Sequence, residues 1–128
     1  MFAWINRHAL LLLHGESLVL HGGAPGIRDE GLLESALMRP ENLVAYGKPD
    51  VFDCAAAYAF GLAKNHPFID GNKRAAFLAG GLLLLLNGVR LTATQPDATL
   101  TMLALAAGDL TEETFAAWLR AHTARLAP

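Results

Sequence analysis

Residues 51–86 read VFDCAAAYAFGLAKNHPFIDGNKRAAFLAGGLLLLL, and this stretch decides the fold. It predicts two nearly all-apolar helices, over 51–65 and 73–86, on either side of a polar loop. A helix that is apolar on most of its faces belongs in the centre of a fold. Frequent alanine keeps the first helix slim, so we expect its neighbours to approach closely. This helix ends before Pro67, because the residue before a proline is disfavoured in the α conformation.

The composition limits the fold class. The chain has 128 residues, of which 53% are hydrophobic and 17% charged, and its formal net charge is −2. It contains 24 Leu and 23 Ala against 7 Val plus Ile, and leucine and alanine are strong helix formers. We therefore expect an all-α fold in a single domain over residues 1–128. The apolar content excludes a disordered chain, and the near-neutral charge argues against direct nucleic-acid binding.

Neither a membrane span nor a secretion signal is expected. The longest apolar run covers residues 75–86, whereas a membrane-spanning helix needs about 20 apolar residues. The first residues lack a basic segment, a following apolar stretch and a small-residue cleavage site. The one cysteine, Cys54, excludes an internal disulfide framework and is typical of a reducing compartment. These features predict a cytoplasmic protein.

Local patterns outside the central pair bring the expected number of helices to about six. The first runs from about 6 to 20, with a buried stripe through Leu10, Leu13, Ser17 and Leu20, widened by Leu11 and Val19. A short helix follows Asp29 to about residue 38 and is stopped by Pro40. Residues 43–46 are expected to form a short extended piece or flap, and residues 90–92 to be briefly extended. Two further helices are predicted, over 95–107 and from 112 onward, the last with Arg120 and Arg125 near its far end.

The loop between the two central helices concentrates polar chemistry. It reads HPFIDGNKR over residues 66–74. His66 ends the first helix, and an imidazole accepts a proton near neutral pH. Phe68 is expected to anchor the loop in the core. Asp70 offers the hard oxygen ligand that Mg²⁺ takes, usually together with phosphate oxygens.

The start of the following helix is suited to an anion. Gly71 and Asn72 begin this helix, where backbone N–H groups and the helix dipole attract phosphate. Lys73 and Arg74 add cations, of which Arg binds phosphate bidentately and Lys acts as a point charge. Together with the imidazole and the carboxylate, these residues predict a site that transfers a phosphate-containing group.

Each of these residues alone also has an ordinary helix-end explanation, as a cap or a solvated first-turn charge. Lys64 has two interpretations: it reaches a phosphate, or it covers the end of its helix. His8, His14 and His21 are separated by 6 and 7 residues, which does not match a helical zinc pair. We expect these three histidines on the surface or at helix ends.

The nine-residue loop resembles the active-site motif of the Fic/Doc superfamily, HxFx[DE]GN[GK]R. Lys73 stands where the adenylyltransferases of that superfamily have a second glycine, which resembles the death-on-curing (Doc) branch. A second stretch, GGAPGIRD at 22–29 followed by GLLESAL at 31–37, resembles the front half of Doc-type proteins. The order of helices and the chain length agree, so the resemblance covers nearly the whole chain.

The resemblance implies a helical Fic fold and a toxin of a type II toxin–antitoxin pair, restrained by a Phd-like antitoxin. Doc-type toxins are kinases that move the γ-phosphate of ATP, with Mg²⁺, to a threonine of elongation factor Tu and so block translation. By this resemblance His66 is the general base and Asp70 holds Mg²⁺. The same resemblance makes three residues, helped by the Gly71 backbone, the phosphate binders: Asn72, Lys73 and Arg74.

Two other functions stay open. One is a Fic-type AMP transferase, because Gly71 is the usual Fic residue whereas some Doc-like motifs have alanine. Lys73 favours phosphate transfer, since it fills space and adds charge where glycine leaves an open nest for a diphosphate. The other is a non-catalytic helical binding module, against which the intact motif speaks.

The sequence lacks the inhibitory segment [ST]xxxE[GN] of autoinhibited Fic proteins, because neither its Glu-Gly pair nor its Glu-Asn pair completes it. Inhibition is therefore expected from another chain, with a helical antitoxin segment in an apolar groove.

Overall fold

A computed structural model describes residues 2–126, so residue 1 and residues 127–128 of the expected domain lie outside the described chain. Its elements are α1 (Arg7–His21), α2 (Glu30–Tyr46), α3 (Val51–Asn65), α4 (Asn72–Leu86), β1 (Val89–Leu91), α5 (Gln95–Ala107), α6 (Glu112–Ala121) and β2 (Thr123–Arg125). The predicted all-α class is confirmed over these residues, with two three-residue strands added. No helix among residues 2–126 has both the length and the hydropathy that crossing a membrane requires.

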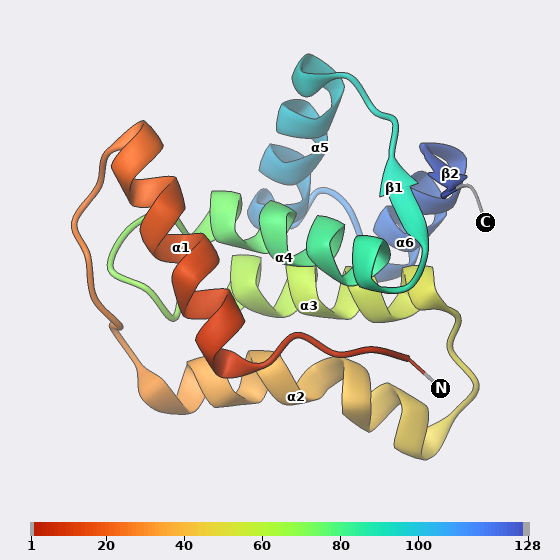
Figure 1. Cartoon of the computed structure of the whole chain (residues 1–128), viewed down its shortest axis with the longest axis horizontal. Helices are drawn as coiled ribbons and strands as arrows, with labels where there is room; N and C mark the ends of the chain where they lie inside the picture. The colour runs from red at the N-terminus through yellow and green to blue at the C-terminus, as the bar shows by residue number, and fades with distance from the viewer. Residues whose placement is uncertain (1, 127–128) are drawn as a thin grey trace.

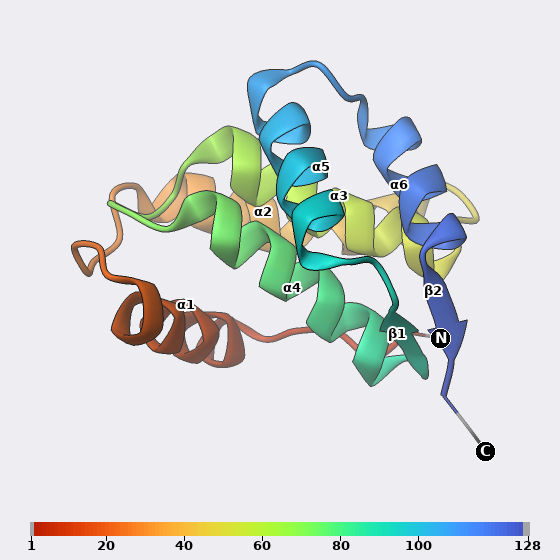
Figure 2. The same cartoon turned by 90° about the horizontal axis from the view of Figure 1, so that it is seen from above.

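The helices α3 and α4 form the centre of the fold, as predicted. α3 packs against α2, α4, α5 and α6, and α1 packs on α4 (Figures 1 and 2). Five alanines of α3 are completely buried: Ala55, Ala56, Ala57, Ala59 and Ala63. A methyl group added at Gly80 of α4 would be in van der Waals contact with the Ala55 carbonyl oxygen, at 3.5 Å. Small side chains therefore set the close approach of the two central helices.

The second helix is longer than predicted. α2 continues to Tyr46 with Pro40 inside it, so the stop at Pro40 and the extended piece at 43–46 are wrong. Proline costs a helical hydrogen bond and crowds the preceding turn. Here, however, Pro40 is buried in the interface, and Arg39 beside it donates to the Ala57 carbonyl of α3 and pairs with Glu112 of α6. Packing against α3 and α6 outweighs the local cost of proline.

The C-terminal part of the described chain forms a small β-ribbon. β1 pairs antiparallel with β2, Arg90 lying opposite Ala124. The extended segment predicted at 90–92 is thus confirmed, with its start one residue earlier. β2 was not predicted: Arg125 lies in this strand and not in the last helix, because α6 ends at Ala121. A strand this short has no periodicity of its own, and its pairing depends on a partner distant in sequence.

The first helix buries only part of the predicted stripe: Leu10 and Ser17 are buried as expected. Its buried residues are Leu10, His14 and Ser17, whereas Val19 and Leu20 are 87% and 78% exposed. The expected stripe is therefore wrong at Val19 and Leu20, and the expected surface or helix-end position is wrong for His14. The observed spacing of i, i+4 and i+7 is that of one helical face.

Candidate functional site

The motif loop joins the end of α3 to the start of α4 at one end of the molecule, beside α1 (Figure 1). His66 directly follows α3 with φ 49° and ψ 56°, and its N–H bonds the Leu62 carbonyl at 3.3 Å. The residue is exposed. The left-handed conformation is less favourable than the right-handed one for a residue with a side chain, so contacts with neighbouring groups stabilise His66 here.

The connector between α1 and α2 supplies these restraints. Arg28 donates from Nε to the His66 carbonyl at 2.7 Å and from Nη2 to the Asn65 carbonyl at 2.8 Å. Its backbone N–H donates to the Pro67 carbonyl at 2.7 Å, and the Asp29 N–H donates there at 3.1 Å. The last carbonyls of a helix have no partner within it. The Arg28 side chain satisfies those of Asn65 and His66, and the N–H groups of Arg28 and Asp29 hold the Pro67 carbonyl, so the connector fixes the turn at His66.

The two stretches that carry the resemblance therefore meet in space. Ile27 and Phe68 form an isolated antiparallel bridge, and the Ile69 N–H bonds the Gly26 carbonyl at 3.1 Å. Phe68 is only 1% exposed, which confirms it as the anchor of the loop. The connector and the motif thus form one structural unit.

Asp70 is held at two points. The Ala24 N–H donates to its Oδ2 at 2.8 Å, and its carbonyl accepts from His14 Nε2 at 2.7 Å. No group of three His, Cys, Asp or Glu residues within 2–126 is placed to hold a metal ion. Among the described residues nothing bonds Asp70 Oδ1, so one carboxylate oxygen is left for a cation. Since Mg²⁺ commonly binds through one or two carboxylates plus substrate phosphates and water, this single carboxylate fits an ion that arrives with a nucleotide.

The N-terminus of α4 has no side-chain cap. Side chains cap the five other described helices, from Asn6, Asp29, Asp50, Thr94 and Thr111. α4 instead follows Gly71, which has φ 78° and ψ 20° and makes no capping bond. A left-handed residue followed by a helical one turns successive N–H groups toward one point, a nest that binds anions. The N–H groups of residues 71–73 have this arrangement.

Asn72 closes the loop with its side chain. Its Oδ1 accepts from the Phe68 N–H and its Nδ2 donates to the Phe68 carbonyl, both at 2.9 Å, and the residue is 7% exposed. The amide is therefore occupied inside the protein. The predicted phosphate contact of Asn72 is left to its backbone N–H.

The cations of the motif face solvent. Lys73 and Arg74 are exposed, and neither takes part in an ion pair within residues 2–126. The Lys64 amine contacts α5: its Nζ is 3.5 Å from the Ala106 carbonyl, near the end of that helix, and 5.9 Å from the Phe60 ring centre. A helix C-terminus favours a cation, so the structure places the Lys64 amine at a helix end.

Two residues at the site were not predicted, His14 and Arg28. The His14 ring stacks on Phe68, with centroids 3.7 Å apart and an interplanar angle of 11°. Its helical spacing with the buried Leu10 and Ser17 was the available signal. Arg28 carries no comparable signal, because its partners are backbone carbonyls of a distant segment.

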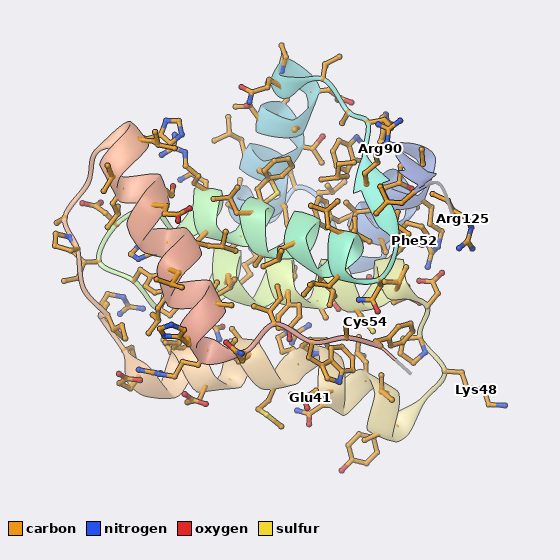
Figure 3. The ribbon with its side chains drawn as sticks, in the orientation of Figure 1. Glu41, Lys48, Phe52, Cys54, Arg90 and Arg125 are labelled. Carbon is orange, nitrogen blue, oxygen red and sulfur yellow. The ribbon has the colours of Figure 1, made fainter. Side chains whose placement is uncertain are left out.

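Other candidate groups lie outside this site. Burial, reinforced by the charges of Asp53 and Asp50, raises the pKa of the Cys54 thiol to about 11. The thiol therefore stays protonated at neutral pH and is no nucleophile. Figure 3 shows Cys54 on the part of α3 remote from the motif loop. A hollow of about 480 Å³ between α2 and α6 is lined by Arg39 and Glu112, among others, but by no residue of the motif.

Comparison with known proteins adds a family to this geometry. The sequence model of the Fic/DOC family matches residues 4–84, which hold α1 to α3, the motif loop and nearly all of α4. The chain is 35% identical over 117 residues to "Protein kinase doc" of Escherichia phage P1, covering 91% of this chain and 92% of that protein. It is 45% identical over 78 residues to "Toxin Doc" of Mycolicibacterium smegmatis, a match that spans 59% of each chain.

Proposed function

Because the chain belongs to the Fic/DOC family, we propose that it is a Doc-type toxin and a protein kinase that transfers the γ-phosphate of ATP to a hydroxyl of a target protein. The observation that carries the proposal is the start of α4, an uncapped glycine nest followed by the exposed Lys73 and Arg74. Enzymes that transfer phosphoryl groups contribute mainly positioning and charge stabilisation. This helix end supplies both.

The roles follow from position. His66 accepts the proton of the target hydroxyl while that oxygen bonds the γ-phosphorus and the bond from phosphorus to ADP breaks. The N–H groups of residues 71–73 bind phosphate oxygens, and Lys73 and Arg74 offset the phosphate charge. Asp70 would hold Mg²⁺ through Oδ1, and the ion would supply further charge neutralisation when bound with ATP.

A labelling experiment separates this proposal from AMP transfer. We propose elongation factor Tu as the target, with a threonine as acceptor, and the assay incubates it with ATP labelled at the α or the γ phosphate. Label from the γ position alone supports the kinase. Label from the α position supports the AMP transferase, the function that Gly71 leaves open. Folded chain that transfers neither label contradicts both enzymes.

Growth of the host tests the non-catalytic alternative. Expression of the chain should arrest growth, and the His66→Asn and Asp70→Asn variants should not. Asn is chosen at His66 because it tolerates the left-handed conformation found there. Arrest by all three chains would indicate a pure binding module.

We also propose a Phd-like antitoxin that docks a helical segment on the toxin. The support lies in exposed apolar side chains, Val19 and Leu20, at the end of α1 that leads into the connector holding Asp70. An amphipathic helix would bury such residues. Co-purification with a co-expressed antitoxin should weaken in a Val19→Ser/Leu20→Ser variant, and equal recovery would exclude this surface.

A further inference from the structure

His14 is a buried polar residue next to the site, yet it has no part in the transfer chemistry above. It belongs to α1, is 5% exposed, and stacks on Phe68. Its Nε2 lies 2.7 Å from the Asp70 carbonyl. Since a carbonyl oxygen only accepts, His14 carries a proton on Nε2. A buried hydrogen bond of this kind fixes the orientation of the peptide group that accepts it.

The orientation of this peptide decides where the next N–H points. In a trans peptide the C=O and N–H point in opposite directions. The Asp70 carbonyl is turned toward His14 and α1, so the Gly71 N–H is turned away from α1. This N–H is the first of the nest at the start of α4. If the peptide rotated, a carbonyl oxygen would take its place and repel a phosphate.

The chain itself does little to prevent this rotation. Gly71 lies at φ 78°, and a glycine moves between backbone conformations with little steric restraint. A Cβ on Gly71 would lie 3.3 Å from Leu18 Cδ2 and 3.5 Å from His14 Nε2. A side chain is therefore disfavoured at this position by its conformation and by the packing of α1. The restraint on the peptide has to come from a neighbour.

We propose that His14 is a positioning residue of the phosphate site, which holds the Asp70–Gly71 peptide so that the Gly71 N–H faces the phosphate. The inference rests on the proposed function of the α4 N-terminus. The Asp70 carboxylate is oriented separately, by the Ala24 N–H at 2.8 Å. Loss of the His14 bond therefore disturbs the nest more than the oxygen assigned to the metal.

Three variants of the full chain separate the hydrogen bond from packing. Gln and Met at position 14 have similar length and shape, but only Gln keeps an N–H donor. Phe keeps a ring to stack on Phe68 without the donor. We expect His14→Met and His14→Phe to bind ATP about tenfold more weakly in the presence of Mg²⁺, the effect of about one hydrogen bond. His14→Gln should stay near wild type, and in the Met and Phe variants kcat at saturating ATP should change less than KM.

Isothermal titration with ATP measures the affinity, and the amide NMR signals of residues 71–73 report the nest without any ligand. In the Met and Phe variants these signals should shift or broaden, and in the Gln variant they should not. Thermal unfolding of each variant ensures that the affinity refers to folded protein. If the Phe variant fails to fold, the Gln and Met pair still provides the comparison.

Met and Phe variants with wild-type affinity and wild-type amide signals would overturn the proposal. Equal losses in all three variants would also overturn it, because they would indicate a structural role that does not depend on the donor. Wild-type chain that binds no ATP would contradict the proposed function instead. In that case the amide signals alone decide whether His14 fixes the peptide.

Discussion

The charged residues at the two ends of α3 differ in whether they have an ion-pair partner in the described chain. At its N-terminus Asp50 and Asp53 form a reciprocal capping box, and both carboxylates bind Arg120, at 2.9 and 2.7 Å. Beyond its C-terminal end, on the other side of the motif loop, Lys73 and Arg74 of α4 have no ion-pair partner in the described chain. At the first end the acidic residues pair with an arginine of the chain itself, whereas at the second end the cations are available to a ligand. Substitutions at the first should change stability, and substitutions at the second should change activity.

Replacing His66 by Asn should have the largest effect, on activity and not on stability. Because a general base contributes about 10²–10⁴-fold to a rate, kcat for phosphate transfer should fall by that factor. Since Asn tolerates the left-handed conformation at φ 49°, the free energy of unfolding should change by less than about 0.5 kcal/mol. Label transfer and urea unfolding measure the two quantities. The control is His8→Asn, which also removes an exposed histidine. Undiminished transfer by His66→Asn would exclude His66 as the base.

Replacing Arg74 by Gln should have the second-largest effect. Hydrogen bonds to charged groups contribute about 1.5–3 kcal/mol, so KM for ATP should rise about 10–100-fold. The free energy of unfolding should not change, because no partner in the described chain loses an ion pair. Arg90→Gln is the matched control: it removes the same charge from an exposed residue, which Figure 3 shows at the β1 end, away from the motif loop. Equal increases in both variants would indicate that only net charge matters.

The central helices were predictable because their signal is local and long. Two apolar runs rich in small residues favour burial, and α3 and α4 pack against each other with most of their alanines buried. The continuation of α2 was not predictable, because Pro40 gives a strong local signal to stop. The partners that overcome it, Ala57 and Glu112 bound to Arg39, are distant in sequence. β2 was missed for the same reason, since only pairing with β1 defines it.

The candidate site likewise has a part that the local sequence predicts and a part that depends on distant contacts. Its contiguous part, residues 66–74, was predictable from residue types, and the uncapped nest at Gly71 agrees with the expected anion site. The supports were not predictable, because His14 and Arg28 act on backbone carbonyls of Asp70, Asn65 and His66. Any residue type has such a carbonyl, so the sequence does not show which carbonyls these side chains contact, although the helical spacing of His14 with Leu10 and Ser17 indicates its burial.

At the capped end of α3, Asp50→Ala should lower stability and leave activity unchanged. Losing an N-cap costs about 0.5–2 kcal/mol, and here the Arg120 contact is lost as well. The free energy of unfolding, from urea titration, should therefore fall by about 1 kcal/mol. KM and kcat of the folded protein should stay at their wild-type values. Asp50→Asn should be milder, because Asn also caps well. A change in KM without a change in stability would show that the two ends are not separate.

The smallest expected effect concerns the pH dependence of stability. It should differ between Asp50 and Glu112, two acidic residues that both pair with arginine. Burial opposes ionisation of Asp50, but hydrogen bonds from Arg120 and from the Asp53 N–H outweigh it, so its pKa lies below 3.8. Its contribution to stability is therefore present above 3.8 and is lost as the pH falls through the lowered value. Burial of Glu112 outweighs the nearby Arg39 and raises its pKa above 4.5. Its contribution is present below 4.5 and is lost as the pH rises through the raised value.

Asp50→Asn and Glu112→Gln should therefore change the pH profile of stability in opposite directions. The stability of wild type relative to Asp50→Asn should increase as the pH rises toward about 3.8, and relative to Glu112→Gln it should decrease as the pH rises above about 4.5. Each change should be only about 0.2–1 kcal/mol, because both ion pairs reach solvent. Urea titrations at several pH values measure it. If the two stability differences changed with pH in the same direction, burial would not outweigh the Arg39 contact at Glu112. The distinction between a carboxylate stabilised by its arginine and one destabilised by burial would then fail.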